Sequence, residues 1–164
     1  MTGSGSLLWG ALAIGVVTGM RSMLAPTMVG AALAERSDID GAGGPAERLA
    51  APRTQRWLLP LAVGELLGDK MPFAPDRTIA PSLLARAVSG GFCAAALAGV
   101  RREPVLAPAL IGATAACVSS VVAIRLRKRY GRSGEVANAA LGLAEDCLAL
   151  AIGNASLRRT LGKA

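Results

Sequence analysis

The chain has 164 residues, of which 52% are hydrophobic, 18% are charged and only 3% are aromatic, with a net charge of +7. Soluble domains average about 25% charged residues, so this composition, which includes 20 glycines, favours helices that pack in a bilayer through small residues. The absence of histidine excludes Ser–His and Cys–His nucleophile pairs, histidine metal sites and histidine proton relays.

The first apolar segment, Leu7–Ala34, is long enough to cross a bilayer but is interrupted by Arg21-Ser22 and Pro26. We interpret its beginning as a retained helix rather than a signal peptide, because no Lys or Arg precedes it and no clear cleavage site ends it. Two structures then remain open. The segment is either one kinked, tilted span or two shorter segments broken at Arg21-Ser22.

A polar loop follows at residues 35–56, with Gly, Pro and charges of both signs. The next apolar segment, Trp57–Asp69, is shorter than the roughly 20 residues that a full span needs. It therefore predicts a half-helix or a segment buried among its neighbours. The prolines within Lys70–Pro81 exclude a regular helix there.

Three longer apolar segments complete the chain: Ser82–Val100, Val105–Ile124 and Val136–Ile152. A basic connection, Arg125–Arg132, separates the last two, and a short basic tail ends the sequence. We expect loop 125–132 to face the cytoplasm, because short cytoplasmic loops are rich in Lys and Arg. The sequence thus predicts an all-α, polytopic transmembrane helix bundle of five or six apolar segments, forming a single transmembrane domain over residues 1–164.

The two halves of the chain share a degenerate pattern. Gly19-Met20-Arg21 and Leu24-Ala25-Pro26 correspond in order to Gly99-Val100-Arg101 and Leu106-Ala107-Pro108, which lie 80 and 82 residues further along the chain, and an acidic residue in an apolar run closes each half. This predicts two inverted three-segment repeats, about 6–70 and 82–153, with broken or short helices. Chance similarity between Ala/Gly/Leu-rich helices is the alternative.

Acidic pairs inside apolar runs are the candidate site. Carboxylates at membrane depth cost about 2.5–3.5 kcal/mol on insertion scales, so they usually have a function. We expect a proton- or cation-binding site formed by Glu65, Asp69, Glu145 and Asp146. Basic residues in or beside the same segments are candidate counter-charges or anion-binding groups: Arg21, Arg86 and Lys70. The alternative is that these charges form ion pairs that only hold helices together, with Arg86 also able to reach the membrane surface.

Enzymatic activity is not expected. The Gly-x-Gly-Asp signature of intramembrane aspartyl proteases is absent around Gly68-Asp69, and there is no Gly-rich phosphate loop. The three cysteines, Cys93, Cys117 and Cys147, have no metal-ligand spacing and are interpreted as free thiols in packed helices. We therefore expect no metal and no cofactor.

Several motifs together resemble a known family. They are Gly19–Ser22 with Pro26, Gly64–Pro72, Arg77–Gly90 and Ala144–Ala149. In this combination the chain resembles the bacterial membrane proteins grouped as domain of unknown function 4126 (DUF4126). The resemblance covers almost the whole chain except the loop at 35–56. It implies a multi-pass protein of the bacterial inner membrane and assigns no activity.

Two classes of function remain open. The first is a small transporter or channel in which the buried carboxylates bind a proton or cation near the membrane midplane. The second is a non-transporting structural or lipid-interacting membrane protein whose charges form a static salt-bridge network. The expected partners are the lipid bilayer, a small ion or solute, and a second copy of the chain. Nucleic acid is not expected, because the basic residues cluster at the ends of spans.

Overall fold

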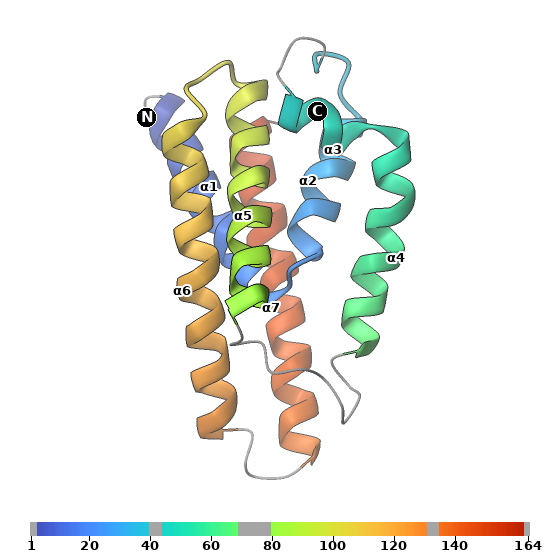
Figure 1. The fold of residues 1–164 in the computed structure, drawn as a ribbon, viewed down its shortest axis with the longest axis vertical. Coiled ribbons are helices and arrows are strands. Elements are labelled where there is room, and N and C mark those ends of the chain that lie inside the picture. Colours follow the sequence, from blue (N-terminus) through green and yellow to red (C-terminus); the bar gives the residue numbers. More distant parts are fainter. Residues whose placement is uncertain (1–2, 40–43, 69–79, 131–134, 163–164) are drawn as a thin grey trace.

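The computed structural model describes residues 3–39, 44–68, 80–130 and 135–162, and these ranges contain seven helices and no strand. The helices are α1 (Gly3–Met20), α2 (Leu24–Ala34), α3 (Gly44–Ala50), α4 (Pro52–Gly68), α5 (Ala80–Val100), α6 (Leu106–Tyr130) and α7 (Glu135–Leu161). The longer helices run along the long axis of the molecule, and the short α3 lies at one end beside the start of α4 (Figure 1). The predicted all-α fold is confirmed.

Three helices in the described part of the chain are long and apolar enough to cross a membrane: Ala80–Val100, Leu106–Leu126 and Ala140–Leu161. Two further apolar stretches are shorter, Gly5–Met20 and Leu24–Ala34. These lengths and compositions suit a membrane protein. The structure does not confirm the larger number of five or six spans.

The first apolar segment is broken into two helices. Helix α1 ends at Met20 and α2 begins at Leu24. Of the two alternatives, one kinked span or two shorter segments, the structure therefore has the two shorter segments. Pro26 lies in the first turn of α2, where its missing N–H needs no partner inside the helix. In a continuous helix the Ser22 carbonyl would accept a hydrogen bond from the N–H of residue 26, which proline does not have. Here the Ser89 hydroxyl donates to the Ser22 carbonyl instead, at 3.3 Å.

Two expectations about non-helical segments were wrong, and the basic tail, for which no secondary structure was predicted, is helical as well. The polar loop at 35–56 contains α3 and the beginning of α4, which starts at Pro52, a favourable first helical residue. The basic connection 125–132 is helical through Tyr130, as the end of α6, because Arg and Lys are good helix formers. The basic tail is helical through Leu161, where arginines in the last turn of α7 complement the helix dipole.

Helix α1 is the centre of the bundle and packs against α5, α6 and α7. It carries fully buried side chains such as Ile14 and Val17. Close approach to α6 depends on Gly15, because a Cβ there would overlap the carbonyl oxygen of Gly112. Gly15 and Gly19 form a Gly-xxx-Gly motif of the kind that lets membrane helices approach closely, and Gly19 also faces α6, at Ala116 and Ser119. A second Gly-xxx-Gly motif, Gly64 and Gly68, differs, because a Cβ at Gly64 would meet no atom within 4 Å.

The predicted repeat pairs α1 with α5, α2 with α6, and α4 with α7. In Figure 1 the helices of each pair run in opposite directions, as inverted halves require. Their lengths differ greatly, since α2 has 11 residues and α6 has 25. Helix α3 also has no counterpart among the described residues of the second half. The inverted repeat stays a prediction.

Candidate functional site: a charge network at a helix break

The break between α1 and α2 exposes backbone N–H groups that lack partners inside a helix. The carboxylate of Glu65, on α4, accepts hydrogen bonds from them. Its Oε1 accepts from the Ser22 N–H at 2.8 Å and from the Ser22 hydroxyl at 2.7 Å. Its Oε2 accepts from the Met23 N–H at 2.8 Å. A side chain more than 40 residues away in sequence thus caps the N-terminus of α2.

Arg86, on α5, closes the other side of the break. Its Nη1 donates to the last carbonyls of α1, at 2.8 Å to Gly19 and 3.3 Å to Thr18. Its Nη2 lies 3.7 Å from Glu65 Oε1. Only 5% of Arg86 is exposed, so the alternative in which it reaches the membrane surface is wrong. The positive charge of Arg86 is favourable at the C-terminus of α1, where the helix dipole is negative. The same charge also attracts the carboxylate that caps the N-terminus of α2.

Arg21 forms the second ion pair of the break. Its Nε lies 2.5 Å from Oδ1 of Asp146, on α7. Arg21 is 3% exposed, and the side chain of Asp146 is 19% exposed. Glu145, the preceding residue on α7, is half-buried as well. Arg21 was predicted as a counter-charge for a carboxylate, and Asp146 is that carboxylate.

Small polar residues complete the site, and the sequence analysis did not identify them. The Ser120 hydroxyl donates to the Gly19 carbonyl at 3.0 Å and to the Ala116 carbonyl of its own helix at 2.8 Å. Ser89 donates to the Ser22 carbonyl, as described above. Their only signal in the sequence is a serine inside an apolar span, which is common in membrane helices.

The structure therefore brings four of the seven predicted site residues into one network: Arg21, Glu65, Arg86 and Asp146. Their formal charges cancel, as buried charges require. Glu145 lies beside this network in sequence. Asp69 and Lys70 lie outside the described residues. The described part of the chain contains no cluster of three or more metal-ligating side chains.

The cysteines take no part in these contacts. All three are free thiols, with Cys93 buried, Cys117 half-buried and Cys147 exposed. The thiols are free as expected, but the expected packed position is wrong for Cys147, which is exposed.

Comparisons with known proteins add no assignment. No family model matches the chain, and neither a curated protein nor a solved structure matches it. The resemblance to DUF4126 stays a prediction, and function has to be argued from the site alone.

Proposed function

We propose that the chain is a small multi-pass membrane protein that moves a proton or a small cation, and that the network of Arg21, Glu65, Arg86 and Asp146 is its site. One observation carries this proposal. A broken helix presents bare N–H groups inside the bundle, and a carboxylate from another helix closes them. Broken helices at depth are a feature of transporter binding sites, and non-helical backbone is tolerated there only where protein or a cavity surrounds it.

The register of the spans supports a site within the hydrocarbon layer. Arg86 lies in α5 and Asp146 in α7, and both helices are among those long and apolar enough to cross a membrane. On α6, Ser120 lies five residues before Arg125, where the apolar run of the sequence ends. Five residues of helix correspond to about 8 Å, so Ser120 lies within the apolar part of α6.

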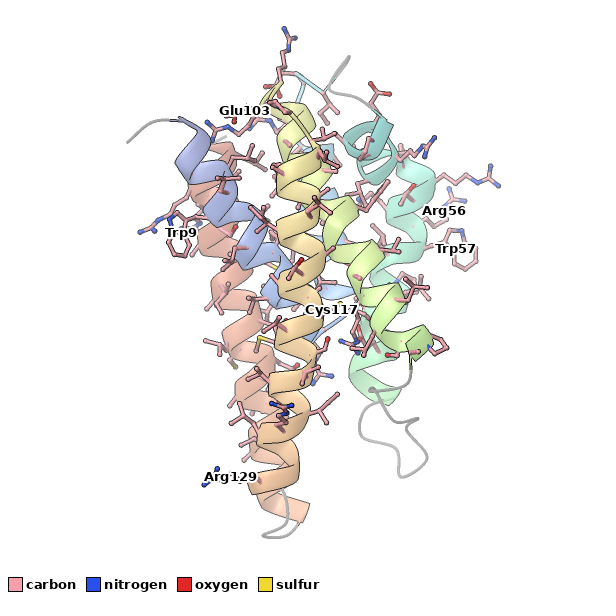
Figure 2. The ribbon with its side chains drawn as sticks, turned by 60° about the vertical axis from the view of Figure 1, so that its left-hand side comes forward. Trp9, Arg56, Trp57, Glu103, Cys117 and Arg129 are labelled. Carbon is pink, nitrogen blue, oxygen red and sulfur yellow. The ribbon has the colours of Figure 1, made fainter. Side chains whose placement is uncertain are left out.

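Two exposed tryptophans support the placement of these helices across a bilayer. Trp9 is 67% exposed and Trp57 is 65% exposed, and they lie at similar heights on α1 and α4 (Figure 2). Tryptophan collects at membrane–water interfaces. Along the long axis Trp9 lies below Glu103 and above Cys117 (Figure 2), in the half of the molecule where α6 begins. The 19 residues of α6 from Leu106 to Arg125 span about 28 Å, close to the thickness of the hydrocarbon core.

The chemistry of the break suits a charge-dependent switch. Neutralisation of Glu65 by a proton or cation would weaken its attraction to Arg86 and its hold on the Ser22 and Met23 N–H groups. The α1–α2 connection would then be free to change its angle, as hinge positions do. Binding of the ion and movement of the two half-helices would therefore be coupled, which is the requirement for alternating access.

A static network is the second candidate, and the pairing itself favours it. Each of the two carboxylates already has an arginine partner, and the bonds join α1, α2, α4, α5 and α7. In that case the charges lock a structural or lipid-interacting membrane protein. For either candidate we place the protein in the bacterial inner membrane, with the Arg125–Arg132 end cytoplasmic, and we propose that it acts as a homodimer.

Ion flux distinguishes the two candidates. The wild type, Glu65→Gln and Asp146→Asn are reconstituted in liposomes that trap a pH dye, with proton, Na⁺ and K⁺ gradients applied in turn. Glu103→Gln is the control, because Glu103 pairs with Arg101 at 3.6 Å in the α5–α6 turn, away from the break. Flux in the wild type and control that is lost in both site variants, while they still melt cooperatively, supports transport. An absence of flux in every sample, with lowered melting temperatures in the site variants only, supports the static network.

A further inference from the structure

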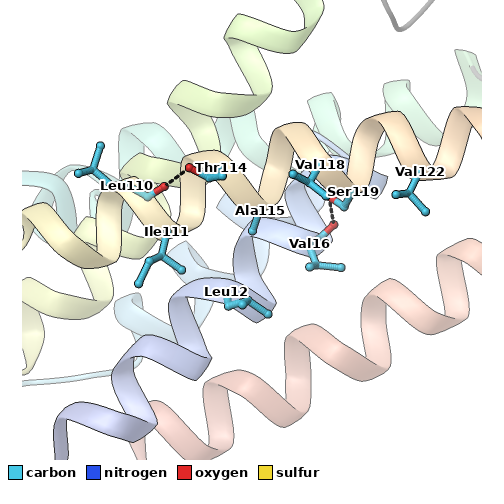
Figure 3. A pocket seen from close by; sticks show the side chains of 9 residues that line it. All are labelled: Leu12, Val16, Leu110, Ile111, Thr114, Ala115, Val118, Ser119 and Val122. Carbon is cyan, nitrogen blue, oxygen red and sulfur yellow. Dashed lines mark hydrogen bonds between the residues drawn. The ribbon is translucent and has the colours of Figure 1, made fainter.

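An open apolar groove of about 640 Å³ lies along the boundary between α1 and α6. Figure 3 shows it bordered by Leu12 and Val16 from α1 and by a line of α6 side chains that includes Leu110, Thr114, Val118 and Val122. The two helices run in the same direction here, since Gly15 faces Gly112 and Gly19 faces Ser119. If the helices cross the bilayer as proposed above, the groove therefore extends along the membrane normal.

The groove offers almost no hydrogen-bonding capacity. The Thr114 hydroxyl donates to the Leu110 carbonyl of its own helix at 2.8 Å. The Ser119 hydroxyl donates across the helix boundary to the Val16 carbonyl at 3.2 Å. Both bonds are drawn in Figure 3. With its hydroxyls bonded internally, the groove suits a hydrocarbon occupant better than a polar one.

Positive charge lies at one end of the groove. Val118, Val122, Arg125 and Arg129 follow one another along α6 at spacings of four, three and four residues. All four therefore lie on the same face of α6. Both arginines are exposed. They stand at the end of the span Leu106–Leu126, at the depth where lipid phosphates lie. The α6 wall from Leu110 to Val122 is about 18 Å long, slightly more than one leaflet of the hydrocarbon core.

We propose that this groove binds one anionic phospholipid, with an acyl chain between α1 and α6 and its phosphate on Arg125 and Arg129. Charge complementarity favours a lipid over a second copy of the chain. In a dimer with its twofold axis along the membrane normal, residues at equal depth approach one another. A dimer through this groove would thus bring the arginines of both copies together. This inference rests on the proposed placement of the helices across a bilayer and not on ion transport.

Native mass spectrometry of the purified chain in detergent tests the proposal, with phosphatidylglycerol and phosphatidylcholine of the same acyl chains as probes. We expect the wild type to retain phosphatidylglycerol preferentially. The double variant Arg125→Gln/Arg129→Gln should weaken phosphatidylglycerol binding about fivefold for each arginine removed. The matched control Arg158→Gln/Arg159→Gln removes the same charge from exposed positions at the other end of the bundle and should bind like the wild type.

The groove itself is tested with a bulky substitution. Thr114→Phe should fill it and reduce retention of both lipids, whereas Val88→Phe, at an exposed position on α5, should not. Val118→Phe replaces Thr114→Phe if the latter does not melt cooperatively. Equal retention of the two lipids by the wild type, equal losses in the two arginine double variants, or no effect of either groove variant would overturn the proposal. A dimer mass that disappears in the groove variant would assign the groove to a second copy and would overturn it as well.

Discussion

The Glu65 carboxylate on α4 accepts a hydrogen bond from the backbone N–H of Met23 at 2.8 Å, just before the first residue of α2. This bond joins two segments with no local connection and satisfies an N–H group at a helix N-terminus inside the bundle. Met23 itself provides no side-chain cap. The energy of the break therefore depends on one carboxylate from a different helix, and removing that carboxylate is the most direct test of the site.

Replacing Glu65 with alanine should strongly destabilise the protein. The change leaves two N–H groups and one hydroxyl without their acceptor and removes the ion-pair partner of Arg86. Breaking a buried ion pair by removing one partner costs about 3–5 kcal/mol. Equilibrium unfolding in mixed detergent, followed by circular dichroism, measures the loss in free energy of unfolding. Glu103→Ala is the control, since both partners of its pair are about one quarter exposed, and it should cost at most about 1 kcal/mol. Equal effects of the two variants would show that Glu65 does not hold the break.

Arg21 and Asp146 should be energetically coupled. Arg21→Gln and Asp146→Asn each remove one half of a largely buried ion pair, so each alone should cost several kcal/mol. The double variant should cost clearly less than the two single losses combined, because no uncompensated charge remains. A double-mutant cycle on unfolding free energies measures this coupling, for which contacting pairs give about 0.5–3 kcal/mol. The same cycle on Arg101 and Glu103 is the comparison, and additive losses at Arg21 and Asp146 would contradict the pair.

The two small-residue motifs should respond oppositely to alanine. At Gly15 a Cβ would overlap the backbone of α6, and overpacking of this kind typically costs about 1–3 kcal/mol. At Gly64 a Cβ meets no neighbour, and replacing a glycine inside a helix with alanine gains about 0.5–1 kcal/mol. Gly15→Ala should therefore melt below the wild type and Gly64→Ala at or above it. A loss at Gly64 would indicate that α4 packs against a surface outside this chain.

The sequence predicts which residues are unusual better than it predicts their partners. Arg21 inside an apolar run, followed by Pro26, indicated a kink or a break, and the structure has the break. No local pattern indicates that Glu65 caps α2 or that Asp146, rather than another carboxylate, meets Arg21. Those choices depend on how α4 and α7 pack against α1, and this packing is a property of the whole bundle.

The boundaries of the helices were predicted less well, for a physical reason. Hydropathy marks where a helix would leave the hydrocarbon layer, whereas a helix ends where its backbone hydrogen bonding ends. On α6 the apolar run of the sequence stops at Arg125 and the helix continues to Tyr130. Basic residues favour helix as well as the membrane surface, so the change in polarity at Arg125 was wrongly interpreted as a loop.

The loop after α2 should make a pH-dependent contribution to stability. Arg36 donates to Asp38 through Nε and Nη2, at 2.8 and 2.7 Å, and through Nη1 to the Leu161 carbonyl at 2.9 Å. Asp38 thus orients the arginine that caps the end of α7. The hydrogen bond from Arg36 lowers the pKa of Asp38 below its ordinary value of 3.8. A carboxyl group whose pKa is lowered on folding stabilises the fold above its unfolded-state pKa and loses this effect as the pH falls through the folded-state value.

The melting temperature of Asp38→Asn should accordingly lie slightly below that of the wild type at pH 7. The difference should shrink once the pH falls below 3.8, the ordinary pKa from which Asp38 is lowered, because the wild-type carboxyl group then becomes neutral as well. In an Arg36→Gln background the same substitution should have no effect at either pH, since the partner is absent. Melting curves of the four proteins between pH 7 and pH 2.5 measure this. A difference that persists unchanged at pH 2.5 would mean that Asp38 stabilises the loop without its charge, through backbone geometry rather than through Arg36.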